Sequence, residues 1–149
     1  MRMASILVVC VGNLCRSPAG ERLLQARLPE LRIASAGLAA VTGSPADPQA
    51  LAVAAARGVS LEGHVARQFT SALGTGFDLI LVMEPHHRQQ IGRGAPQLFG
   101  RTLLFDRWTG NTGIPDPYGR STEFHEATFV RLSAAADAWA QRLRERIEE

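Results

Sequence analysis

One segment near the start of the chain restricts the possible folds more than any other. Residues 5–9 form a continuous apolar run, Ser-Ile-Leu-Val-Val, which is typical of a strand buried on both faces of a sheet. A turn containing glycine follows, and Ser17-Pro18 then offers a helix N-cap with proline at the first helical position. We therefore predict a strand, a loop and a helix over residues 5–28.

The rest of the sequence continues this alternation of strands and helices. The expected strands cover residues 32–35, 77–83 and 101–105, and the expected helices cover about residues 48–57, 85–91 and 121–147. In the last helix the apolar residues recur every three or four positions and define one buried stripe. This stripe consists of Leu132, Ala136, Trp139, Leu143 and Ile147.

The alternation predicts a single domain over residues 1–149 with an α/β fold. We expect a four-stranded parallel sheet, doubly wound, with helices on both faces and a ligand site at the carboxyl ends of the strands. The 149 residues, 46% of them apolar, fit one globular domain. Apolar runs fall short of a membrane span, which needs roughly 20 residues, and the first strand leaves no room for a secretory leader. We expect a cytoplasmic monomer without direct membrane insertion.

The basic residues exclude several kinds of chemistry. All 16 are arginines, so the chain has no lysine for a Walker A motif, a Schiff base or a serine-lysine dyad. The net charge is only +2 and the arginines are scattered, so we do not expect nucleic-acid binding. His86 and His87 have only Glu84 as a nearby carboxylate, so we expect no metal and no cofactor.

The segment from Cys10 to Arg16 carries most of the chemical information. Gly12 lets this strand-to-helix loop curl until successive N–H groups point at one centre, which forms an anion nest at a helix N-terminus. The planar fork of Arg16 would hold two oxygens of a tetrahedral anion there. The same N–H groups would favour the thiolate of Cys10. We predict a nucleophile beneath a phosphoryl group, whereas Cys15 alone fits a buried hydrophobic role equally well.

A candidate general acid lies near the other end of the chain. Asp116 stands between two prolines, which limit the freedom of its loop and can hold the carboxyl over a pocket. Tyr118 beside it would form an aromatic wall. Taken alone, the segment also fits an ordinary solvated Asp-Pro turn. Together with a cysteine nucleophile, it favours an acid that protonates a leaving oxygen.

These motifs resemble those of the low-molecular-weight protein tyrosine phosphatases along nearly the whole chain. The matching segments are residues 10–18, 35–37, 64–68, 78–83 and 116–118. The resemblance implies that Cys10 is the nucleophile, that Arg16 binds the phosphoryl group, and that Asp116 is the acid in the first step and the base in the second. It implies hydrolysis of phosphotyrosine through a phosphocysteine intermediate, without a metal.

The resemblance also implies roles for residues around the nucleophile. The phosphate-binding loop would comprise Val11, Gly12, Asn13, Leu14 and Cys15. The residues that hold this loop and stabilise the thiolate would be Asn13, Ser17, Ser35 and His64. In the family, the residue matching Cys15 can form a reversible disulfide with an oxidised nucleophile.

Two departures from the vertebrate members indicate a subgroup. Gly119 stands where those members have a second tyrosine, and the loop over residues 37–47 contains no aromatic residue. One pocket wall must then be aliphatic, and the candidates are Leu38 and Val41. Both departures resemble the bacterial subgroup encoded with exopolysaccharide machinery, whose partners are tyrosine autokinases with tyrosine-rich tails. The resemblance therefore implies a phosphotyrosine protein substrate, such as an autokinase tail.

Two other functions use the same loop. An arsenate reductase on this fold needs further thiols to carry a disulfide outward, and the sequence has none beyond Cys15. A phosphotyrosine-binding module would bind the anion without turnover, but the presence of both Cys10 and Asp116 argues against it. We therefore favour the phosphatase.

Overall fold

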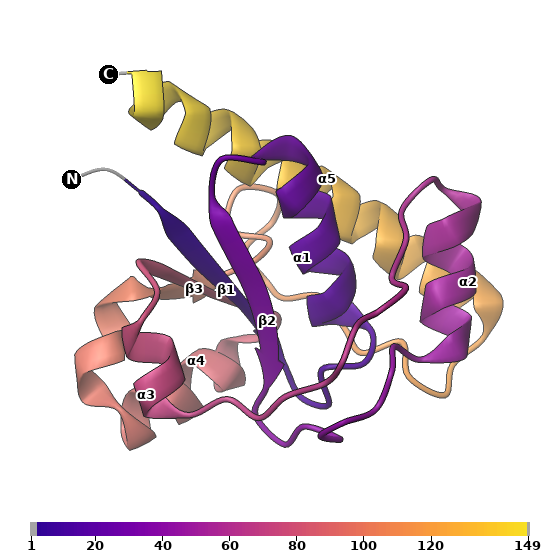
Figure 1. The fold of residues 1–149 in the computed structure, drawn as a ribbon, viewed down its shortest axis with the longest axis horizontal. Helices are drawn as coiled ribbons and strands as arrows, with labels where there is room; N and C mark the ends of the chain where they lie inside the picture. Colours follow the sequence, from indigo (N-terminus) through magenta and orange to yellow (C-terminus); the bar gives the residue numbers. More distant parts are fainter. Residues whose placement is uncertain (1–2, 149) are drawn as a thin grey trace.

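The structure is a computed structural model that describes residues 3–148, with side chains described up to residue 145. It consists of a parallel sheet with helices on both faces (Figure 1). The strands are β1 (Ser5–Cys10), β2 (Arg32–Gly37), β3 (Leu79–Val82) and β4 (Thr102–Leu104). The helices are α1 (Arg16–Arg27), α2 (Pro48–Ala56), α3 (Ser71–Thr75), α4 (Pro85–Gly94), η1 (Pro96–Arg101, a 3-10 helix) and α5 (Thr122–Glu148).

The sheet has the strand order β2-β1-β3-β4, and every pair is parallel. In the centre of the sheet, Val8 of β1 is paired with Ser35 of β2 and with Leu81 of β3. The predicted four-stranded, doubly wound parallel sheet is confirmed. Because the strands are parallel, their carboxyl ends lie along one edge, where ligands of such folds bind.

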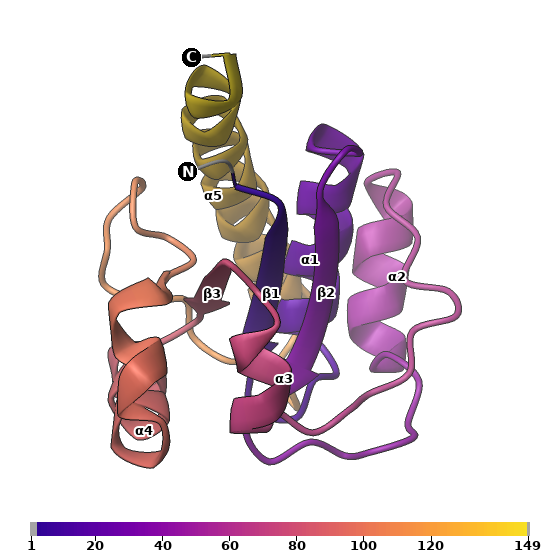
Figure 2. The same cartoon turned by 60° about the vertical axis from the view of Figure 1, so that its left-hand side comes forward.

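The central strand β1 explains why its sequence is apolar without interruption. Alternate side chains of a strand point to opposite faces. Ile6 and Val8 pack into the core beneath α1 and α5, and Leu7 and Val9 pack into the core on the other face. Figure 2 shows the two layers, with α1, α2 and α5 on one side of the sheet and α3 and α4 on the other. A strand buried on both faces has no side chain facing solvent, so polar and apolar residues do not alternate along it.

The apolar stripe of the last helix packs as predicted. Leu132, Ala136, Trp139 and Leu143 are all buried in the core between α5 and the sheet. The side chain of Ile147 lies outside the described residues. Among the helices of residues 3–148, none has the length and apolar character that a bilayer crossing requires.

Some boundaries differ from the predictions for physical reasons. The predicted N-cap at Ser17 is wrong, because α1 already begins at Arg16 and Cys15 occupies the cap position without a side-chain hydrogen bond. The hydroxyl of Ser17 lies inside the first turn and faces Cys10 instead. The sequence analysis also missed α3 and η1, which at 5 and 6 residues are too short to display a helical period.

Candidate active site

The cysteine loop, residues 10–15, joins β1 to α1 at the carboxyl edge of the sheet. Each of its six backbone carbonyls accepts a hydrogen bond from outside the loop. The carbonyls of Cys10, Val11 and Gly12 accept from the N–H groups of Leu38 (2.9 Å), Ala39 (3.0 Å) and Val41 (3.1 Å). The carbonyls of Asn13, Leu14 and Cys15 accept from His64 Nε2 (2.7 Å), the N–H of Asp47 (3.0 Å) and the N–H of Ala19 (3.3 Å).

These bonds determine where the N–H groups of the loop point. In a trans peptide the N–H of the next residue points away from the carbonyl, and no cis peptide occurs in residues 3–148. Because the six carbonyls face outward, the N–H groups of residues 11–16 face the interior of the loop. Such converging N–H groups at a helix N-terminus bind anions.

Asn13 fastens the loop to three surrounding elements. Its backbone φ of 61° lies in the left-handed region, which asparagine tolerates better than most residues, and its side chain is fully buried. The Nδ2 group donates to the hydroxyls of Ser17 (2.7 Å) and Ser35 (3.1 Å), and Oδ1 accepts from the N–H of Arg67 (2.9 Å). Asn13 therefore ties the loop to α1, to β2 and to the segment before α3.

Gly37 at the end of β2 allows the loop to approach the sheet closely. A Cβ atom at this position would lie 2.3 Å from the carbonyl oxygen of Val11 and 3.0 Å from the backbone nitrogen of Asn13. Any side chain here would displace the cysteine loop. The glycine in the Ser35-Ala-Gly37 motif is therefore required by this contact.

Cys10 lies at the base of the loop with a hydroxyl beside it. Its Sγ atom is 2.9 Å from Ser17 Oγ. Because Ser17 Oγ accepts a hydrogen bond from Asn13, its single proton is directed either to the sulfur or to the more distant carbonyl of Ala36 (3.4 Å). The sulfur of Cys10 therefore has a hydroxyl donor within reach.

Cys15 differs chemically from Cys10, although both are free thiols. Burial raises the pKa of Cys15, and the negative charges of Asp47 and Cys10 raise it further. Cys15 is therefore held in its protonated form, in which a thiol is a poor nucleophile.

Arg16 is held by one edge of its guanidinium. The buried Nη1 group donates to Glu84 Oε2 (2.9 Å) and to the carbonyl of Ile114 (2.7 Å). The edge formed by Nε and Nη2 is the one available to two oxygens of a ligand. Partial burial raises the pKa of Glu84, but the hydrogen bond and the charge of Arg16 lower it more, so the pKa falls below its ordinary value. Glu84 therefore stays ionised as the partner of Arg16.

Two of the three possible metal ligands near α4 take part in contacts within the protein. Glu84, His86 and His87 place ligand atoms within 4.8 Å of one another. However, the Glu84 carboxylate binds Arg16, and His87 Nδ1 accepts from the N–H of Glu84 (3.2 Å) in a capping box. Burial lowers the pKa of His87 to about 4, with the charges of Arg16 and His86 adding to the effect, so this ring is neutral. Glu84 thereby orients Arg16, and His87 Nε2 lies 3.5 Å from Glu84 Oε2 without a hydrogen-bond partner among the described residues.

A cavity opens above the cysteine loop. Its side walls are formed by Leu14, Ala39, Val41 and Tyr118. Asp116 stands at the rim, where its Oδ2 lies 3.8 Å from Arg16 Nη2 and its side chain is half exposed. The cavity combines an apolar slot with an anion-binding floor and an acid at its edge.

The structure corrects the expectation that Leu38 lines this cavity. Leu38 lies in the turn after β2, and its half-buried side chain packs against the core beside α3 together with Ala36. Ala39 and Val41 form the aliphatic wall instead. The other predicted site residues all lie in the cavity or in contact with the cysteine loop. The sequence analysis missed Glu84 as a partner of Arg16, although its position directly after a buried strand was a signal.

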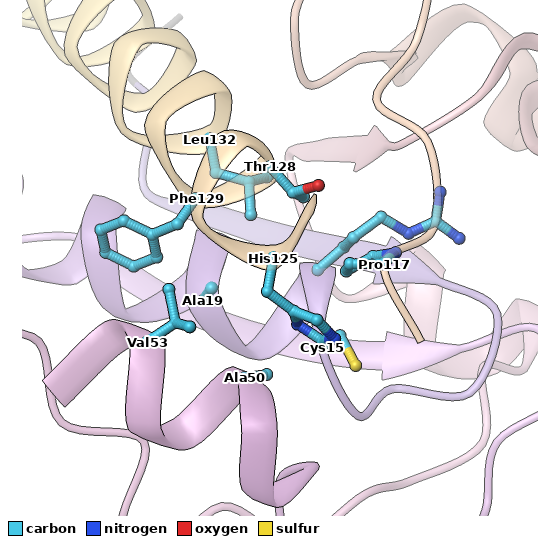
Figure 3. A pocket seen from close by; sticks show the side chains of 10 residues that line it. Cys15, Ala19, Ala50, Val53, Pro117, His125, Thr128, Phe129 and Leu132 are labelled. Atoms are coloured by element: carbon cyan, nitrogen blue, oxygen red, sulfur yellow. The ribbon is translucent and has the colours of Figure 1, made fainter. Parts of the chain in front are cut away.

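A second cavity lies behind the loop, between α1, α2 and α5 (Figure 3). Cys15 lines it together with His125, and the remaining wall is mostly apolar, with Val53 and Phe129 among its residues. His125 is only 3% exposed, and its Nε2 atom has no hydrogen-bond partner among the described residues. A buried polar atom without a partner costs about 1–3 kcal/mol of stability.

The fold and the site together define a class of enzyme. A parallel α/β sheet carries a cysteine, an anion nest and an arginine on its first loop, with a carboxyl above them, and these are the parts of a cysteine-dependent phosphatase. Residues 5–149 match the family model described as low molecular weight phosphotyrosine protein phosphatase. The chain belongs to this family of protein-tyrosine-phosphatases.

Known relatives agree with this assignment. The low molecular weight protein-tyrosine-phosphatase Wzb of Escherichia coli K12 is 50% identical over 139 residues, which cover 93% of this chain and 95% of the relative. The crystal structure of Wzb from E. coli K30 in complex with sulphate is 47% identical, with a TM-score of 0.93, and covers 95% of this chain and 99% of that one. The YwlE arginine phosphatase of Geobacillus stearothermophilus is more distant, at 30% identity and a TM-score of 0.90, over 96% and 94% of the two chains.

His125→Leu tests whether the buried imidazole lowers the stability of the folded protein. The substitution removes a polar atom without a partner and fills an apolar cavity, so we expect the free energy of unfolding to rise by about 1 kcal/mol. Urea denaturation measures it, with the exposed His86→Leu as the control. A loss of stability specific to His125→Leu would mean that Nε2 has a stabilising partner.

The neutral state of His87 predicts acid sensitivity. The pKa is about 4 in the folded protein and 6.5 in the unfolded chain, so below pH 6.5 the unfolded state binds a proton that the folded state does not. The resulting decrease in the free energy of unfolding is small at pH 7 and reaches about 2 to 3 kcal/mol at pH 4.5. Urea unfolding at the two pH values should show a smaller acid loss for His87→Gln than for the wild type or His86→Gln. Equal acid-induced losses of stability in all three proteins would contradict the lowered pKa of His87.

Proposed function

We propose that this phosphatase hydrolyses phosphotyrosine in proteins with Cys10 as the nucleophile, Arg16 as the phosphoryl-binding residue and Asp116 as the acid and base. One observation carries the proposal: all six carbonyls of the cysteine loop are hydrogen-bonded outward, so its N–H groups converge above Cys10. The loop also includes Leu14, whose side chain lines the slot that would receive the aromatic ring.

In the first step the thiolate of Cys10 attacks phosphorus in line with the leaving tyrosine oxygen. A sulfur–phosphorus bond forms as the bond between phosphorus and the phenolic oxygen breaks, and Asp116 gives its proton to that oxygen. The loop N–H groups and Arg16 stabilise the charge on the three other oxygens, as preorganised donors do at an oxyanion. Ser17 supports the thiolate at a distance of 2.9 Å.

In the second step a water molecule attacks the phosphocysteine. The ionised Asp116 takes a proton from this water, the sulfur–phosphorus bond breaks, and Cys10 leaves as a thiolate that Ser17 again stabilises. Inorganic phosphate is released from the nest. Cys15 takes no part as a nucleophile, because burial raises its pKa.

For the natural substrate we infer the tyrosine-rich tail of a bacterial tyrosine autokinase in the cytoplasm. The support is the resemblance to the exopolysaccharide subgroup, which rests on Gly119 and on the aliphatic wall of Ala39 and Val41. Turnover of phosphorylated tail peptides, compared with unrelated phosphotyrosine peptides, tests this partner. A lower kcat/KM for the tails than for the unrelated peptides would contradict it.

Other activities of this fold provide the comparison substrates. Phosphoarginine is one comparison substrate for the activity measurements, because a relative at 30% identity is named an arginine phosphatase. Arsenate with a thiol reductant tests the reductase alternative, and any turnover of an aryl phosphate excludes a module that only binds. We expect phosphotyrosine to give the highest kcat/KM of these substrates.

Cys10→Ser tests the nucleophile. We expect kcat for p-nitrophenyl phosphate to fall about a thousandfold or more, because a serine hydroxyl is a far weaker nucleophile and a poorer leaving group. Inorganic phosphate should still bind, since the N–H groups and Arg16 remain. The Cys15→Ser variant is the matched control and should lose much less activity. Substantial turnover by Cys10→Ser would refute the mechanism.

Asp116→Asn tests the general acid. Without a proton donor, phenyl phosphate has to release a more basic oxygen than p-nitrophenyl phosphate does, so its kcat should fall more. The wild-type rate should be bell-shaped in pH, because Cys10 must be ionised while Asp116 is protonated, and the variant should lose the decline on the alkaline side. An equal decrease in kcat for both substrates would contradict the role of Asp116 as the acid.

A further inference from the structure

The wall of the active-site cavity is a short backbone segment without regular secondary structure. We define the wall segment as residues 38–41, which follow β2 directly. The N–H groups of Leu38, Ala39 and Val41 are bonded to the cysteine loop, as described above. The N–H of Ala40 is the exception, because it points away from the cysteine loop to a different partner.

That partner is the side chain of Gln68, which binds the wall segment from its outer side. Gln68 Oε1 accepts from the N–H of Ala40 (2.9 Å), and Nε2 donates to the carbonyl of Leu38 (2.8 Å). The Nε2 group also donates to the carbonyl of Phe69 (3.2 Å). An amide group has one acceptor end and one donor end, so only one orientation of this side chain satisfies all three bonds.

The backbone that carries Gln68 is itself anchored next to the active site. The N–H of Gly37 donates to the carbonyl of Arg67 (2.9 Å), and the N–H of Phe69 donates to the carbonyl of Gly37 (2.8 Å), on either side of Gln68. The N–H of Arg67 also donates to the side chain of Asn13. Gln68 therefore projects from a base that is fixed independently of the wall segment.

The position of this backbone sets the shape of the wall. Ala39 is small, and Val41 is 49% exposed, so neither side chain is held in place by surrounding packing. A small shift of the segment would widen the slot between these residues and Tyr118. The anion nest depends on the wall segment only in part: the carbonyls of Cys10, Val11 and Gly12 accept from it, whereas those of Asn13, Leu14 and Cys15 have donors elsewhere.

We propose that Gln68 is a positioning residue that holds the wall segment against the cavity and thereby sets the affinity for the aromatic ring of the substrate. Gln68 does not line the cavity, so it acts through Ala40 and Leu38 and not by touching substrate. The inference rests on the proposed function in one respect, namely that the slot receives an aryl group.

Gln68→Ala and Gln68→Met test this role, because they distinguish an effect on binding of the aromatic ring from an effect on binding of the phosphate. The KM for p-nitrophenyl phosphate should rise about three- to tenfold, because two hydrogen bonds to the wall are lost. Both kcat and the inhibition constant of inorganic phosphate should change less than KM does, because the carbonyls of Asn13, Leu14 and Cys15 keep donors outside the wall segment. Gln68→Glu keeps the acceptor for Ala40 but sets a carboxylate oxygen against the carbonyls of Leu38 and Phe69, so its KM should rise at least as much as that of Gln68→Met.

Gln49 provides the matched control, because it is a half-buried glutamine outside the site with a side-chain hydrogen bond, to Thr122. Gln49→Ala should change none of the three constants. An unchanged KM in Gln68→Met, which retains the side-chain length, would overturn the inference. Parallel increases in KM and in the phosphate inhibition constant would also overturn it, because Gln68 would then act on the anion site. Absence of aryl phosphatase activity in the wild type would instead refute the proposed function.

Discussion

The structure depends on how one six-residue loop satisfies its own peptide groups. Converging N–H groups require the carbonyls on the opposite side to find donors elsewhere, because a buried carbonyl without a partner is costly. Four outside segments supply these donors: the wall segment after β2, the start of α2 at Asp47, His64, and the first turn of α1 at Ala19. The loops around the sheet therefore do more than connect it, since they hold the cysteine loop in an anion-binding shape before any ligand arrives.

The same principle applies to the charged groups of the site. Arg16 is oriented by Glu84 and by a backbone carbonyl at Nη1, and its Nη2 group lies 3.8 Å from Asp116 Oδ2. Burial keeps Cys15 protonated, while Cys10 has the hydroxyl of Ser17 beside its sulfur. Electrostatic stabilisation is strongest when donors need no rearrangement during the reaction. Most of the polar contacts described here provide that preorganisation.

Local patterns predicted the parts of the molecule that are determined locally. The apolar run of β1 and the stripe on α5 were predicted correctly because their causes lie within a few residues. The resemblance supplied the roles of Cys10, Arg16 and Asp116. The pairing of Glu84 with Arg16, 68 residues away, and of Gln68 with Ala40, 28 residues away, could not be predicted, because only the folded topology brings these residues together. For Glu84, the sequence gives only its position directly after a buried strand as a signal. The choice of Ala39 over Leu38 depended on where β2 ends, and sequence patterns locate strand ends poorly.

A crystal structure with bound inorganic phosphate tests the central claim most directly. The account predicts that the phosphate oxygens lie within hydrogen-bond distance of the loop N–H groups and of the Nε and Nη2 edge of Arg16. The phosphorus atom should stand directly above the sulfur of Cys10, with the six loop carbonyls still bonded outward. Phosphate bound elsewhere, or carbonyls turned into the loop, would contradict the account.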